Sequence, residues 1–340
     1  MSISAGTLFI RASFGVVAGM GHALRDLHTA LLLSMLLDLR FVYDGIETVP
    51  AGVHDDNIRE IGEHQKAHDW DAVFGLRDLY PTNAAVRNSY DETVRLTGNG
   101  RWSLFDHSDI VRMKKLVDDC RRCGRRVMFE VQENERLMYW QVVEWERAGL
   151  ERPGVSASFR RDIRAAFDTT RKNYLGRRAA ATRPRVALHI RNSGEWPDTE
   201  QDRLVQRESA ADVATWLGVP VEIYSEGTEK DMASIQALYR DVPSCMYFNE
   251  NTVETFVAMA TSDILLCGGS SFVHTAGLLS PGLKLTWQEK LCDYEFGGAT
   301  QAFALDDEWL LVRGRLRRDA FLNRFESATR SAPIFGDQGA

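Results

Sequence analysis

The chain has 340 residues, of which 44% are hydrophobic and 26% are charged, a composition typical of a soluble globular protein. Its length exceeds that of one ordinary domain, so we expect two domains. The formal net charge of −7 argues against general nucleic-acid binding, so any phosphate binding must come from a local basic site.

The first half predicts a Rossmann-like domain that opens with a strand, a helix and a second strand. In the first helix, leucines recur at spacings of three and four, which is the pattern of a buried helix. The expected strands are 8–17, 40–43 and 126–131, and the expected helices are 22–39, 109–120, 137–147 and 159–175. The basic, alanine-rich stretch 177–184 ends in proline and is interpreted as a linker, so the predicted domains are 1–180 and 181–340.

The second half alternates strands and helices more regularly, which predicts a doubly wound parallel sheet. Its expected strands are 186–190, 221–224, 245–248, 263–267 and 283–287, and its expected helices are 209–217, 229–238, 252–260 and 273–279. The strand at 283–287 is expected to be the last, with a C-terminal tail after it. The fold class is therefore α/β, with two Rossmann-like domains facing a cleft.

No apolar run reaches the roughly 18 residues of a membrane span. Arg11 interrupts the apolar start of the chain, which is therefore unlike a signal peptide. We expect a cytoplasmic protein with no membrane span. The five cysteines are widely spread, and the pair Cys120 and Cys123 lacks a second pair or a histidine at zinc-site spacing, so it is assigned no role.

A glycine cluster, Gly19 and Gly21, separates the first strand from its helix. One interpretation is a tight turn, and another is a dinucleotide site with Asp44 on the ribose, although Leu24 stands where that motif needs a third small residue. A third is the wall of a ligand cleft, with His22 and Arg25 facing into it.

The strand 186–190 carries His189 and is followed directly by Arg191. In open α/β sheets, ligands bind at the carboxyl ends of the strands, so Arg191 is placed to grip an anion such as a diphosphate. A surface salt bridge is the alternative for Arg191. His189 points to the same side, and it either holds the loop or contacts the ligand.

A second candidate anion site is the turn at 268–272, between a strand and a helix. Backbone amides at a helix N-terminus bind anions, and Ser270 and Ser271 add two hydroxyls. The alternative is a serine that only caps the helix. Ser225 and Glu226 end a further strand at the same edge and are candidates for contacting the base or ribose.

These blocks together resemble the fucosyltransferase superfamily of GT-B enzymes. The resemblance covers about residues 15–290: the stretch from Gly19 to Arg25, His189-Ile-Arg191 through Glu195, Ser225-Glu226, and Thr255-Phe-x-x-Met-Ala running into Ser270-Ser271-Phe272. It implies an inverting transferase that needs no metal and no cofactor, with a GDP-fucose donor bound by the C-terminal half. Arg191 would then hold the diphosphate. The expected donor-binding residues are His189, Ser225, Glu226, Gly269, Ser270, Ser271 and Phe272.

Inversion requires a carboxylate that deprotonates the acceptor. The position of this acid differs among subfamilies, so Glu195, Asp198 and Glu200 all remain candidates, with Glu195 first because it follows Gly194 at the mouth of the strand. We expect a glycosyltransferase whose partners are a nucleotide sugar and a carbohydrate acceptor, and another GDP- or UDP-sugar stays open as donor. The alternatives are a non-catalytic nucleotide-sugar-binding protein and an NAD-dependent sugar-nucleotide oxidoreductase.

Overall fold

The computed structural model describes residues 7–13, 20–45, 70–97, 105–131, 137–171, 184–191, 200–268, 270–287, 303–304, 308–312 and 315–331. These residues belong to two compact units, one that ends at Arg171 and one that follows it. The predicted boundary at residue 180 and most of the predicted linker lie outside the described residues, so both stay predictions.

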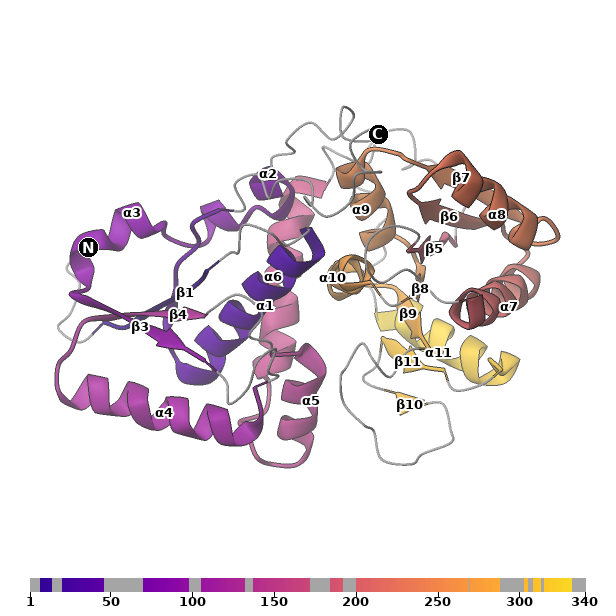
Figure 1. The fold of residues 1–340 in the computed structure, drawn as a ribbon. Helices are drawn as coiled ribbons and strands as arrows, with labels where there is room; N and C mark the ends of the chain where they lie inside the picture. Colours follow the sequence, from indigo (N-terminus) through magenta and orange to yellow (C-terminus); the bar gives the residue numbers. More distant parts are fainter. Residues whose placement is uncertain are drawn as a thin grey trace, which may run out of the picture. The chain divides into compact units, whose positions relative to one another are not determined.

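The first unit is built on a parallel sheet with strand order β2-β1-β4-β3 (Figure 1). Its elements in chain order are β1 (Phe9–Ala12), α1 (Met20–Leu37), β2 (Arg40–Phe41), α2 (Trp70–Phe74), η1 (Leu76–Asp78), α3 (Asn83–Val86), η2 (Arg87–Ser89), β3 (Glu92–Leu96), α4 (His107–Arg122), β4 (Val127–Val131), α5 (Tyr139–Arg147) and α6 (Val155–Thr170). Helix α1 packs against β1, β2 and β4, and also against α4 and α6.

The expected elements of this unit are confirmed in type, and their ends differ. Strand β1 ends at Ala12, and residues 14–17 of the expected strand lie outside the described residues. Helix α1 ends at Leu37 because Asp38 adopts a left-handed backbone with φ of 53°. Helices α2 and α3 and strand β3 are not among the elements predicted from the sequence. Strand β3 lacks the apolar pattern that predicts a strand, because its side chains are exposed or half-buried except for Leu96, which is buried.

The second unit is built on a seven-stranded sheet with order β10-β11-β9-β8-β5-β6-β7. Its elements in chain order are β5 (Val186–Ile190), α7 (Glu200–Leu217), β6 (Val221–Ser225), α8 (Glu229–Tyr239), β7 (Ser244–Phe248), α9 (Thr252–Ala260), β8 (Ile264–Cys267), α10 (Ser271–Leu279), β9 (Leu283–Thr286), β10 (Phe303–Ala304), β11 (Trp309–Leu311) and α11 (Arg318–Ser331). All pairs are parallel except β10 with β11. The α/β class with two parallel sheets is therefore confirmed.

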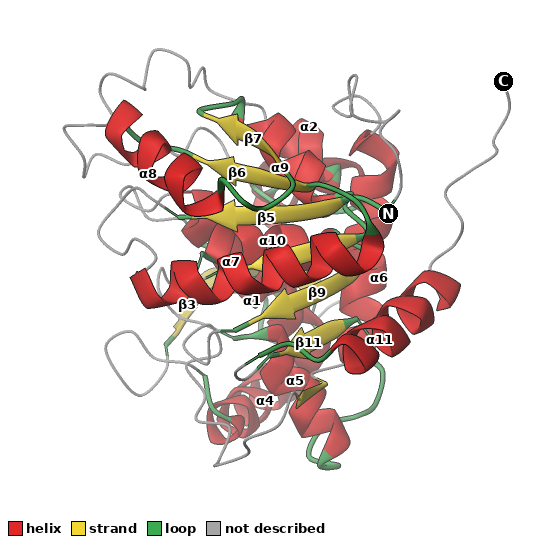
Figure 2. Ribbon diagram, turned by 90° about the vertical axis from the view of Figure 1, so that its right-hand side faces the viewer, coloured by secondary structure: helices red, strands yellow, loops and turns green. Residues whose placement is uncertain are grey.

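The two faces of this sheet differ in chemistry. Alternate residues such as Leu188, Ile223 and Leu266 form a hydrophobic core with α7, α8 and α11, which cross in front of the strands in Figure 2. The residues between them face α9 and α10 and include His189 and Lys284, both buried. Buried polar side chains therefore lie on the sheet face under α9 and α10.

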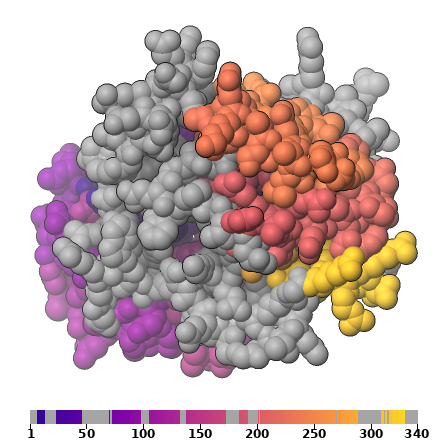
Figure 3. All heavy atoms as spheres, turned by 45° about the vertical axis from the view of Figure 1, so that its right-hand side comes forward, coloured from indigo at the N-terminus to yellow at the C-terminus, as the bar shows by residue number. Residues whose placement is uncertain are grey.

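Two expectations for this unit are wrong. Strand β9 is not the last strand, since β11 pairs with it in parallel and α11 follows. Figure 3 shows α11 in yellow beside α7, and its Phe321 ring lies 5.5 Å from the ring of Trp216. Helix α7 begins at Glu200, nine residues before the expected start at 209, because its first half is polar and gives no apolar periodicity.

Candidate functional site

The strand order of the second unit places one crevice where ligands bind in open α/β sheets. From β5 the chain proceeds outward through β6 and β7, and it then returns to β8 on the other side of β5. The carboxyl ends of β5 and β8 therefore flank the topological switch point. Arg191 follows β5 directly and is half-buried, while Gly268 and Ser270 follow β8 and are buried. The structure thus brings the two predicted anion sites to neighbouring strand ends.

Four helices of this unit begin at this edge, and their first turns differ in charge. Glu200 and Asp202 stand in the first turn of α7, Glu229 and Asp231 in that of α8, and Glu254 in that of α9. Helix α10 has no acidic residue in its first turn. Because a helix N-terminus carries a partial positive charge, these carboxylates neutralise the first three helices, and the start of α10 stays attractive to an anion.

Ser270 is the N-cap of α10, and its Oγ accepts a hydrogen bond from the Phe272 backbone N–H at 3.3 Å. The capping alternative therefore holds for Ser270, and its hydroxyl proton can still be donated to a ligand. Ser271 is the first residue of the helix, and its side chain is not described. Gly269 lies outside the described residues.

The Phe272 ring connects the start of α10 to the neighbouring elements. It lies 5.9 Å from the ring of His189 on β5 and 5.3 Å from that of Phe256 on α9. His189 is only 8% exposed. This packing favours the structural interpretation of His189, which supports the Phe272 ring in the first turn of α10.

Ser225 and Glu226 lie at the carboxyl end of β6, as expected. Ser225 is buried, and its Oγ donates to the carbonyl oxygen of Ile190 at 2.9 Å. Glu226 is half-buried. The next residue, Gly227, is held by the side-chain amide of Asn249, which accepts from its N–H and donates to its carbonyl oxygen, both at 3.0 Å. Side chains therefore fix the loops at this edge.

His274 on α10 was not predicted to matter, and it lies under the turn that opens the helix. Burial lowers the pKa of His274 to about 4. A hydrogen bond to the Gly268 backbone acts in the opposite direction, but its effect on the pKa is smaller. Its Nε2 is buried and has no hydrogen-bond partner in the described part of the chain, so we assign the hydrogen bond with the Gly268 carbonyl oxygen to Nδ1 as the donor. The ring also lies 5.4 Å from that of Trp309.

The three candidate bases are only partly described. Glu195 and Asp198 lie outside the described residues, and Glu200 is the exposed first residue of α7. The sequence contains one Asp-x-Asp stretch, at 69–71, whose last two residues open α2 and whose first lies outside the described residues. Among the described residues, no group of three His, Cys, Asp or Glu side chains is placed to hold a metal ion.

The candidate cleft residues of the first unit are also partly described. Gly19 lies outside the described residues, and Gly21 and His22 belong to α1 without described side chains. Arg25 is half-buried and contacts Asp26 at 3.5 Å. Asp44, the acid required by the dinucleotide alternative, accepts from Arg11 Nη1 at 2.8 Å and from a backbone N–H at 2.7 Å. Both of its oxygens are thus engaged within the protein.

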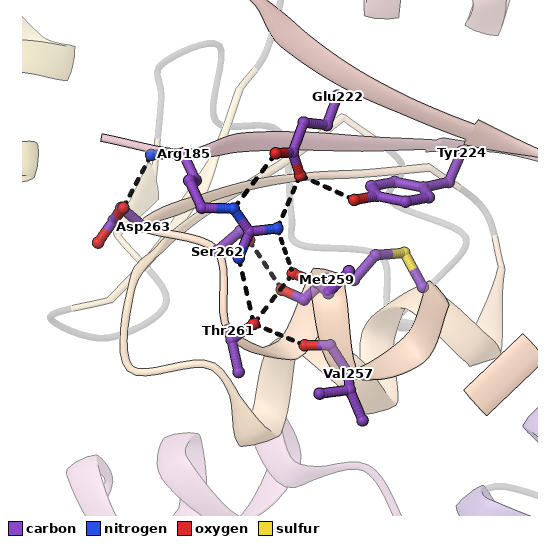
Figure 4. A network of polar contacts seen from close by, with 9 residues as sticks. Arg185, Glu222, Tyr224, Val257, Met259, Thr261, Ser262 and Asp263 are labelled. Carbon is purple, nitrogen blue, oxygen red and sulfur yellow. Dashed lines mark hydrogen bonds and ion pairs between the residues drawn. The ribbon is translucent and has the colours of Figure 1, made fainter. Parts of the chain in front are cut away.

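A polar network that sequence reasoning missed lies at the opposite, amino edge of the second sheet (Figure 4). Arg185, which precedes β5, donates to both carboxylate oxygens of Glu222 at 3.2 and 2.7 Å. The Tyr224 hydroxyl also donates to Glu222, at 2.7 Å. Burial by itself lowers the pKa of Arg185, and Glu222 outweighs it, so this pKa is raised. The network binds β5, β6 and the end of α9 together, away from the strand-end site.

In the part of the chain that the structure describes, no helix is long and apolar enough to cross a membrane. No protein-family model matches the chain, and no curated protein matches its sequence. The solved structures that resemble it include POFUT1 in complex with GDP-fucose, at 11% identity and a TM-score of 0.45, covering 84% of this chain and 98% of that one.

Two bacterial structures are also similar. The E. coli heptosyltransferase WaaC with ADP shares 12% identity at a TM-score of 0.38, covering 95% of this chain and 98% of that one. A glycosyl transferase of family 9 from Veillonella parvula shares 10% identity at a TM-score of 0.35, covering 83% and 80%.

Proposed function

We propose that this chain is an inverting, metal-independent glycosyltransferase that moves a sugar from a nucleotide sugar to a hydroxyl of a carbohydrate acceptor. The observation that carries the proposal is the switch point of the second unit. There the half-buried Arg191 and a helix N-terminus without acidic residues follow neighbouring strands. A guanidinium cation next to a helix N-terminus without acidic residues is suited to a diphosphate.

In the proposed reaction, a carboxylate takes the proton of the acceptor hydroxyl, and the oxygen attacks the anomeric carbon from the face opposite the nucleotide. The bond from that carbon to the phosphate oxygen breaks, and the nucleoside diphosphate leaves with the electron pair. Arg191 and the start of α10 would stabilise the negative charge that develops there. Glu195 is the first candidate for the base, followed by Asp198 and Glu200.

The donor that we test first is GDP-fucose, because the motifs from His189 to Phe272 resemble those of fucosyltransferases. The acceptor is proposed to bind over the first unit, near the start of α1. A nucleotide-sugar-binding protein without catalysis is the outcome to distinguish, and it would bind the donor without hydrolysing it or transferring its sugar.

Thermal denaturation with GDP, UDP, ADP and CMP tests the proposal. A nucleotide at about 100 times its Kd should raise the free energy of unfolding by about 2.7 kcal/mol. Arg191→Ala should abolish most of this shift. The matched control is Arg240→Ala, which removes the same charge from a side chain that is 78% exposed at the end of α8, and it should bind like the wild type. A chain that no nucleotide stabilises would refute the proposal.

A further inference from the structure

The carbonyl oxygens at the switch point are the starting observation. A peptide carbonyl oxygen carries partial negative charge and can only accept hydrogen bonds, so an unoccupied one beside a diphosphate repels it. The carbonyl of Ile190 immediately precedes Arg191, and that of Gly268 directly follows β8, at the start of the turn 268–272. Each of them accepts a hydrogen bond from a buried side chain, namely the Ser225 hydroxyl and the His274 ring.

We propose that Ser225 and His274 are positioning residues of the nucleotide site, which occupy these two carbonyl oxygens and leave the crevice lined by hydrogen-bond donors. The proposal rests on the proposed function and deepens it, since it assigns the preference for an anionic ligand to named side chains. Ser225, expected from the sequence to touch the donor, acts in this account through the peptide that leads into Arg191.

The neighbouring strands show why side chains are needed here. At β6 the Ser225 carbonyl oxygen accepts from the backbone N–H of Asn249 at 3.1 Å, and at β9 the Thr286 carbonyl oxygen accepts from that of Val312 at 2.8 Å. Backbone donors thus serve the strand ends on either side of the crevice. At Ile190, the last residue of β5, and at Gly268, the first residue after β8, the donors are side chains, each only 7% exposed.

The chemistry of the two donors fits this role. A serine hydroxyl and a neutral imidazole each supply one proton without adding a charge. Burial keeps His274 neutral, because it lowers the pKa of the ring to about 4. With the proton on Nδ1, the neutral ring leaves Nε2 without one, and the described residues give that atom no hydrogen-bond partner.

Calorimetric titration tests the proposal with the nucleoside diphosphate that binds the wild type most tightly, and with its uncharged nucleoside. Ser225→Ala should weaken diphosphate binding about tenfold, by the loss of one buried hydrogen bond, and leave nucleoside binding within about twofold. Ser225→Thr keeps the hydroxyl and should restore diphosphate affinity.

The two amide variants of His274 form a matched pair. His274→Asn places an amide nitrogen near the position of Nδ1 and should retain diphosphate affinity, whereas His274→Gln places it near Nε2 and should lose about tenfold. Equal affinities of these two variants, or equal weakening of diphosphate and nucleoside in Ser225→Ala, would overturn the inference. Failure of the wild type to bind any nucleotide would instead overturn the proposed function, and the inference with it.

Discussion

Replacement of Glu222 with glutamine should destabilise the second unit more than any surface substitution. The change keeps the shape of the side chain and removes the negative charge that faces Arg185. The two side chains are 12% and 7% exposed, so the guanidinium would stay buried without its counterion. Its remaining contacts, with Thr261 Oγ1 at 3.3 Å and the Ala258 carbonyl oxygen at 3.4 Å, are long. Loss of one member of a buried ion pair costs about 3–5 kcal/mol, and we expect about 3 kcal/mol here.

Urea unfolding followed by circular dichroism measures this loss, with the two units fitted as separate transitions. The double variant Arg185→Met with Glu222→Leu should recover to within about 1 kcal/mol of the wild type, because apolar side chains of similar size can replace a buried ion pair. Nucleotide affinity should not change, since the network lies at the amino edge of the sheet. A loss below about 1 kcal/mol in Glu222→Gln, or a double variant weaker than either single one, would refute the reasoning.

Three further results are expected. Arg191→Lys should leave less than a tenth of wild-type kcat/KM, about 1.4 kcal/mol, because an ammonium cannot bind a diphosphate with two parallel hydrogen bonds, and near-normal turnover would show that Arg191 is not the diphosphate ligand. Activity should persist in excess EDTA, and activity that EDTA abolishes and Mg²⁺ restores would exclude the metal-independent mechanism. Glu195→Gln should lower kcat and leave donor affinity unchanged. Burial lowers the pKa of His28 and of His274 from 6.5 to about 4, so only the unfolded chain takes up these protons as the pH falls between those values. The free energy of unfolding should therefore be unaffected by these rings above pH 6.5 and should fall by about 3 kcal/mol per ring as the pH drops toward 4. A His28→Leu variant whose unfolding free energy has the same dependence on pH would contradict this.

The predictable parts of the fold are those in which burial is continuous. The five residues of β5 are all buried, and they were predicted with their bounds because an unbroken apolar run admits few alternatives. The bounds of helix α9 also agree with the prediction, because Asn251 marks its N-terminus. The Asn251 Oδ1 accepts hydrogen bonds from two backbone N–H groups of the helix. Helix α7 was placed nine residues late, because the residues from Glu200 on are polar and its contacts are made by later turns.

The candidate site could be predicted only as a set of strand ends. Because the carboxyl ends of parallel strands meet at one edge, the positions of Arg191 and Ser270 follow from the order of the elements. The roles of Ser225 and His274 could not be predicted, because a hydrogen bond from a side chain to a backbone carbonyl leaves no pattern in the sequence. Ser225 reaches the carbonyl of Ile190, 35 residues away, and His274 reaches the Gly268 backbone from within α10. Glu222 and Tyr224 stand at alternate positions of β6, a pattern that is typical of a strand face exposed to solvent. The residues next to them in the sequence do not indicate that Arg185 pairs with Glu222.

The position of β11 and α11 also has a consequence for biosynthesis. These elements are made after β9, yet β11 pairs with it, and Phe321 of α11 is part of the hydrophobic core. At a translation rate of about 5–20 residues per second, the ribosome therefore leaves the outer edge of β9 and the apolar side chains beside it uncovered for on the order of seconds. During that interval the nascent second unit presents an open strand edge, whereas all the described strands of the first unit have already been synthesised. A stop codon before α11 would make that interval permanent, so such truncations should be found with chaperones or in aggregates rather than as folded, inactive protein.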